Sequence, residues 1–84
     1  MNVTDAEVDY VILKASPLHP PPAMSRDLSL ADDLDLGPIT KRVLANDYNQ
    51  ILRRHGSKKT IRPGDAGDCD TVGDAEDLVP SKLN

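Results

Sequence analysis

Proline placement constrains this chain more than any other feature of its sequence. Four of the seven prolines fall between Ser16 and Ala23, and the other three stand alone at positions 38, 63 and 80. Proline lacks a backbone N–H and restricts the residue before it, so it is tolerated in the first turn of a helix and disfavoured further inside. The prolines therefore predict a first helix that ends before Pro17 and an extended loop behind it.

Each end of the chain carries the signal of a helix. Thr4 and Glu7 have the spacing of a capping box, which predicts a helix with one apolar face made of Val8, Val11, Ile12 and Ala15. Near the other end, Thr71 and Asp74 form a similar pair, and this helix is expected to stop at Pro80. Its predicted apolar face consists of Val72, Ala75, Leu78 and Val79.

The middle of the chain has clear helix boundaries. Gly37 is suited to cap a helix and Pro38 to be its first residue, and Gly56 is a natural left-handed stop. A polar loop then ends at Ile61, which is expected to enter the core, and a single helical turn is expected over 63–68. The buried stripe predicted for this middle helix consists of Ile39, Val43, Leu44, Tyr48, Ile51 and Leu52.

These segments predict an all-α four-helix bundle with a long proline-containing loop after the first helix. Eighty-four residues suffice for one small domain, residues 1–84, with its core at about 4–79. The chain has two tyrosines and neither Phe nor Trp, so the core is expected to be aliphatic. One shared core is predicted for Val8, Ile12, Val43, Tyr48, Ile51, Ile61, Val72 and Leu78.

The residues before the middle helix carry a family resemblance. The run from Leu28 to Ile39 reads LSLADDLDLGPI and resembles the stretch of acyl carrier proteins that leads into their second helix. In that family leucine and two acidic residues are followed by leucine, glycine, one further residue and then aspartate-serine-leucine. Counted from Asp33 and Leu34 without gaps, Gly37-Pro38-Ile39 falls where aspartate-serine-leucine is expected.

A second stretch resembles the same family. The run from Ile61 to Ala75 reads IRPGDAGDCDTVGDA and is similar to the family's short third helix and the start of its fourth, including the string TVGDA. The resemblance covers roughly residues 4–79 and is poorest over 16–23. It implies the acyl carrier protein fold and a role in acyl-chain metabolism of the fatty-acid or polyketide type.

The resemblance also implies that the family's cofactor is missing. The serine that carries 4′-phosphopantetheine is replaced by Pro38, which has no hydroxyl to form the phosphodiester. Thr40 and Ser29 offer hydroxyls, but neither has the flanking aspartate and leucine that the modifying transferases recognise. We therefore expect no cofactor and a module that recognises proteins, either enzymes of acyl-chain metabolism or another carrier protein. A genuine acyl carrier with a displaced attachment residue is the alternative.

Charge is distributed unevenly along the chain. Residues 41–62 hold seven basic residues against Asp47, a local charge of +6, whereas the whole chain carries −4. In acyl carrier proteins the second helix is normally acidic and docks on basic patches of enzymes, so this chain departs from the family. A partner-binding surface is predicted at Lys41, Arg42, Arg53 and Arg54. A solvated face without function and a basic adaptor for an acidic partner or polyanion are the alternatives. Nucleic acid is disfavoured, because only Tyr48 interleaves the charges.

Other kinds of function have little support in the sequence. His19 and His55 lie far apart and Cys69 has no histidine near it, so the chain is not expected to be an enzyme. A calcium loop starting at Asp68 would place Val79 where a bidentate acid is required, so no metal site is predicted. The single cysteine and the short apolar runs predict a cytoplasmic protein that does not enter membranes.

Overall fold

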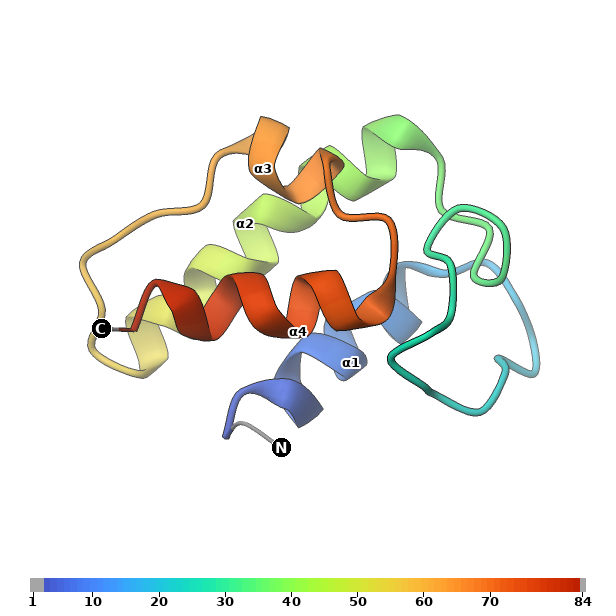
Figure 1. The fold of residues 1–84 in the computed structure, drawn as a ribbon, viewed down its shortest axis with the longest axis horizontal. Coiled ribbons are helices and arrows are strands. Elements are labelled where there is room, and N and C mark those ends of the chain that lie inside the picture. Colours follow the sequence, from blue (N-terminus) through green and yellow to red (C-terminus); the bar gives the residue numbers. More distant parts are fainter. Residues whose placement is uncertain (1–2, 84) are drawn as a thin grey trace.

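The computed structural model describes residues 3–83, which form four helices and no strand (Figure 1). The helices are α1 (Asp5–Ala15), α2 (Pro38–Arg54), α3 (Pro63–Gly67) and α4 (Val72–Ser81). α2 contacts each of the other three helices, and α1 also contacts α4. The prediction of an all-α chain with four helices and a long first loop is confirmed. Within these residues no helix is both long and apolar enough to cross a membrane.

The boundaries of α2 lie where the sequence predicts them. Gly37 is the N-cap, with extended backbone angles, and Pro38 is the first helical residue. At the other end Gly56 has a φ of 82°, which glycine adopts without strain because it lacks a Cβ. The next N–H, that of Ser57, donates to the carbonyl of Leu52 at 2.9 Å, as in a Schellman turn.

The capping box of α4 is confirmed. The hydroxyl of Thr71 accepts a hydrogen bond from the Asp74 N–H at 3.1 Å. The Asp74 carboxylate accepts hydrogen bonds from the N–H groups of Asp70 at 2.9 Å and Thr71 at 3.2 Å. These two backbone donors hold the pKa of Asp74 below its ordinary value. This box fixes the direction in which α4 leaves the preceding loop.

The capping box predicted for α1 is wrong. Thr4 is the N-cap residue, but its backbone is helical (φ −90°, ψ −9°) and its side chain makes no capping hydrogen bond. A capping hydroxyl needs an extended backbone at that position to reach the third N–H of the helix. Glu7 instead turns toward the end of α2, where its carboxylate lies 2.8 Å from Nε2 of His55.

Pro80 does not end α4 as predicted. The helix runs through Pro80 to Ser81, because a proline in the last turn removes only one backbone hydrogen bond. Tighter bonds close the end, from the N–H of Lys82 to the Val79 carbonyl and from that of Leu83 to the Pro80 carbonyl. Leu83 packs against the core, so the packed region extends beyond the predicted limit at residue 79.

The core is almost entirely aliphatic, as expected from the composition. Tyr48 is its one aromatic residue among residues 3–83, and Ile61 enters it from the loop before α3. Leu78 is partly buried and packs against the core. The buried hydrophobic residues are Val8, Val11, Ile12, Leu30, Leu34, Leu36, Leu44, Ala45, Tyr48, Ile51, Leu52, Ile61, Ala66, Cys69, Val72, Ala75 and Val79.

The predicted burial of Ile39 and Val43 is wrong. Ile39 is 76% exposed and Val43 is 55% exposed. Successive residues of an α-helix are rotated by about 100°. Nine residues separate Ile39 from the buried Tyr48, and they therefore lie about half a turn apart. The two apolar side chains lie on the solvent side of α2, opposite the face that packs on the core.

The loop over 16–37 is held by leucines and by backbone pairing. Leu30, Leu34 and Leu36 are buried in the core. The N–H of Leu30 donates to the Asp70 carbonyl at 2.9 Å, and the N–H of Val72 donates to the Leu28 carbonyl at 3.0 Å. The end of this loop is therefore fixed beside the start of α4, and it delivers the chain to the start of α2.

We expect Ile51→Ala and Val43→Ala to differ sharply in their effect on stability. Ile51 is fully buried, so its truncation should lower the free energy of unfolding by about 2–5 kcal/mol. Val43 is exposed and its truncation should change this energy by less than about 0.5 kcal/mol. Urea unfolding followed by far-UV circular dichroism measures both. Equal losses in the two variants would contradict the assigned orientation of α2.

Candidate functional site

The start of α2 is presented at the surface by a turn built from acidic residues. The Asp33 carboxylate accepts a hydrogen bond from the Ser29 N–H at 2.7 Å, and the Ser29 hydroxyl accepts one from the Asp32 N–H at 3.0 Å. The acidic pair of the LSLADDLDLGPI run thus shapes the turn. Gly37 and Pro38 follow it and are both exposed. Position 38 is accessible, and the residue there has no nucleophilic atom.

One face of α2 combines apolar and polar residues that are exposed to solvent. We call it the outer face of α2, and it consists of Ile39, Arg42, Val43, Asn46, Gln50 and Arg53. These residues recur at spacings of three and four, which places them on one side of the helix. The buried residues of α2 lie on the other side and are Leu44, Ala45, Tyr48, Ile51 and Leu52.

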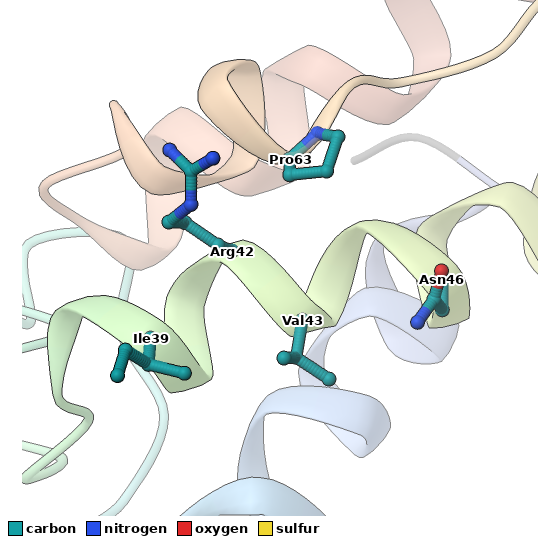
Figure 2. A pocket seen from close by; sticks show the side chains of 5 residues that line it. All are labelled: Ile39, Arg42, Val43, Asn46 and Pro63. Carbon is teal, nitrogen blue, oxygen red and sulfur yellow. The ribbon is translucent and has the colours of Figure 1, made fainter.

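An open pocket of about 250 Å³ lies on the outer face, between α2 and α3. Its lining residues are Ile39, Arg42, Val43, Asn46 and Pro63. Figure 2 shows Ile39 and Val43 one turn apart on α2, with Arg42 extended toward α3 and Pro63 across from them. The pocket offers apolar carbon, one guanidinium group and one amide group to a binding partner.

The position of Arg42 depends on a glycine of α3. A Cβ built on Gly67 would lie only 2.9 Å from Cγ of Arg42. The aliphatic part of the Arg42 side chain therefore rests directly on the α3 backbone, while the residue as a whole stays exposed. This contact directs the guanidinium along the edge of the pocket.

The four cations predicted as a partner surface do not lie together. Arg42 and Arg53 are on the outer face, eleven residues and about three turns apart. Lys41 points to the other side, where its Nζ donates to the Cys69 carbonyl at 3.0 Å. Arg54 faces α1, with its Nε 3.9 Å from a Glu7 carboxylate oxygen. Of the four predicted cations, Arg42 is therefore the one that borders the pocket.

Ile39 and Val43 are the site residues that sequence reasoning missed. Their residue types predict a buried stripe, and both were expected in the core. A helical projection centred on Tyr48 separates them from the core and groups them with Arg42. The spacing of these residues in the sequence was therefore sufficient to predict that they lie on the exposed side of α2.

The remaining reactive groups have structural contacts. Cys69 is buried, and its thiol donates to the Asp65 carbonyl at 3.6 Å. Burial, with a smaller contribution from the Asp74 charge, raises the pKa of this thiol to about 11. His55 is held by Glu7 at the end of α2. In the described part of the chain no three His, Cys, Asp or Glu residues are placed to hold a metal ion.

Comparison with protein-family models, curated proteins and solved structures finds no match for this chain.

We expect the Cys69 thiol to be unreactive in the folded protein. A pKa of about 11 leaves little thiolate at pH 8, so labelling with a disulfide reagent should be at least about 100-fold slower than in the unfolded chain. Stopped-flow absorbance with and without 8 M urea measures the two rates. Equal rates would show that the thiol is exposed and would remove the packing role of Cys69 between α3 and α4.

Proposed function

We propose that this protein has the shape of an acyl carrier protein, lacks the phosphopantetheine arm of that family and functions by recognising another protein. It resembles acyl carrier proteins, is not an enzyme, carries no 4′-phosphopantetheine, and works in the cytoplasm in acyl-chain metabolism of the fatty-acid or polyketide type. It binds an acidic protein partner, either an enzyme of that metabolism or another carrier protein. The observation that carries the proposal is the outer face of α2, where Ile39 and Val43 are exposed beside Arg42.

Burial of the two exposed apolar side chains would favour the binding of a partner. Ile39 and Val43 leave most of their surface in water. Full burial of one such side chain is worth about 1.5–3 kcal/mol. Both line one pocket with Pro63, so a single apolar residue of a partner could cover them together. Protein interfaces are commonly built around such a buried apolar anchor with polar groups at its rim.

The charges around this apolar anchor indicate the sign of the charge that the partner carries. Arg42 borders the pocket and Arg53 lies on the same face of α2. The exposed Arg62 directly precedes Pro63, at the start of α3. Acidic side chains would be attracted to this rim, which raises the rate of encounter and selects against basic partners. This is the reverse of the usual docking in the family that the sequence resembles.

The start of α2 supports a function without the cofactor. Attachment of phosphopantetheine needs a hydroxyl oxygen at the helix start, and Pro38 supplies only ring carbons there. A genuine carrier would need another hydroxyl, such as Thr40 or Ser29, as its attachment residue. Thr40 lies inside the first turn of α2, Ser29 lies in the turn before it, and both are only partly exposed. A polyanion adaptor is the third possibility. It is disfavoured because Tyr48 is buried, which leaves no aromatic ring on α2 for base stacking.

We expect the protein to keep its unmodified mass when it is expressed with a broad-specificity phosphopantetheinyl transferase. Intact-mass spectrometry makes the measurement, and the double variant Gly37→Asp with Pro38→Ser is the positive control. A side chain at position 37 meets no atom within 4 Å, and aspartate is a good N-cap, so this variant should fold. Addition of one phosphopantetheine to the wild-type chain would refute the proposal and favour the genuine carrier.

We expect an acidic amphipathic helical peptide, with two leucines four residues apart and glutamates around them, to bind at the pocket. Arg42→Glu and Ile39→Ser should each weaken binding at least about 10-fold, through charge repulsion and loss of apolar contact respectively. Lys14→Glu makes the same charge change on α1 and should have less than about a 2-fold effect. Fluorescence anisotropy at low and moderate salt measures the affinities.

A comparison of an acidic peptide with its uncharged counterpart tests the sign of the partner's charge. A peptide in which glutamine replaces each glutamate should bind more weakly and with less dependence on salt. Amide chemical shifts should change around Ile39, Arg42 and Val43 when the acidic peptide is added. Equal binding by wild type, Arg42→Glu and Ile39→Ser would contradict the outer face as the interface.

A further inference from the structure

A buried cluster of acidic side chains joins α1, α4 and the long loop. Glu76 of α4 is only 5% exposed and Asp5 of α1 only 4%. Asp9, one turn after Asp5, has one buried oxygen, Oδ1. Arg26 of the loop reaches the cluster with Nη1, 3.2 Å from Oε1 of Glu76. The recognition surface on α2 involves none of these residues.

Arg26 does not balance the negative charges of Glu76, Asp77 and Asp9. Arg26 is shared between two carboxylates, since its Nη2 lies 2.8 Å from Oδ2 of Asp77. The groups that act electrostatically on Glu76 are Asp5 and Asp9 from α1 and Arg26 from the loop. If Asp9, Glu76 and Asp77 were all ionised, three negative charges would lie around this one guanidinium group. Buried charges without compensation are costly, so such a cluster favours the binding of a proton.

The contact between Asp9 and Glu76 shows where a proton fits. The two carboxyl groups lie within hydrogen-bonding reach of each other. Two ionised carboxylates have no hydrogen to donate, and Oδ1 of Asp9 is buried without a donor among residues 3–83. One proton shared by the pair would convert the repulsive contact into a hydrogen bond between α1 and α4.

We propose that Asp9 and Glu76 share one proton and that this proton fastens α1 to α4, so that the joint is tight in mildly acidic solution and loosens above neutral pH. Burial first, and then the contact with Asp9, raises the pKa of Glu76 to about 7, against the opposing effect of Arg26. The folded protein therefore holds a proton that the unfolded chain, with an ordinary glutamate pKa of 4.5, releases. The resulting stability is complete below pH 4.5 and is lost as the pH rises through about 7.

Two other charged groups must be separated from this effect. The pKa of Asp74 is lowered, so its contribution is lost only in acid, below the ordinary value of 3.8. His55 lies with Nε2 2.8 Å from a Glu7 carboxylate oxygen and joins α1 to α2. The test therefore includes His55→Gln as a matched control, because this variant removes the ionisable partner of Glu7 that joins α1 to α2.

Thermal unfolding at pH 5.5 and pH 8.0, followed by circular dichroism, tests the proposal. The melting temperature of the wild type should be lower at pH 8.0 by at least about 5 °C. Glu76→Gln keeps the shape and supplies an amide donor to Asp9, so its melting temperature should vary much less between the two values. Asp9→Asn should behave in the same way, and His55→Gln should keep the wild-type difference.

A spectroscopic measurement keeps the proposal testable even if a variant fails to fold. Infrared difference spectra of the wild type between pH 5.5 and 8.0 should show the C=O stretch of one protonated carboxyl group that disappears as the pH rises through about 7. Absence of that band, or equal melting temperatures of the wild type at the two pH values, would overturn the proposal. A difference that persists in Glu76→Gln and vanishes in His55→Gln would assign the effect to the histidine and also overturn it.

Discussion

The position of α2 depends on backbone hydrogen bonds between two segments whose paired residues lie at least 40 positions apart. The N–H groups of Leu30, Val72 and Gly73 bind carbonyl oxygens across the junction between the long loop and the start of α4. The same junction places Leu30, Leu34 and Leu36 in the core. Without it, a loop with four prolines would leave the start of α2 free to move. The pairing thus converts a flexible connection into a fixed platform for the outer face.

Local signals in the sequence were sufficient for most of the helix boundaries. Gly37, Pro38, Gly56 and Thr71 act through the backbone of their own neighbourhood, and each has the predicted role. The Thr4 box failed because Glu7 finds partners on α2, a contact that no local rule contains. Likewise, the end of α4 depends on packing of Leu83 against the core and not on Pro80 alone. Predictions were reliable where the determining contact is near in sequence.

The candidate site was predicted less well, for a related reason. Charge clustering along the chain identified Lys41, Arg42, Arg53 and Arg54 as a group, but a helix distributes neighbouring residues around its axis. Lys41 reaches the loop before α4 and Arg54 approaches α1, whereas Arg42 and Arg53 share the outer face. Apolar residue type also concealed Ile39 and Val43, whose exposure follows from their position on the side of α2 opposite the buried Tyr48. The mixed apolar and basic character of the site follows from the way a helix distributes these residues around its axis, which the residue spacing already contains.

The close approach of Arg42 to Gly67 gives one position of α3 control over a residue on another helix. Because a methyl group at position 67 would overlap the Arg42 side chain, even the smallest substitution there would force the guanidinium to a new direction. The net charge and the residues of α2 would stay the same. If the outer face binds a partner as proposed, changes at position 67 would alter which partners are accepted while every residue of the outer face is retained. The choice of partner would then be changed by a residue of α3 that is not part of the outer face.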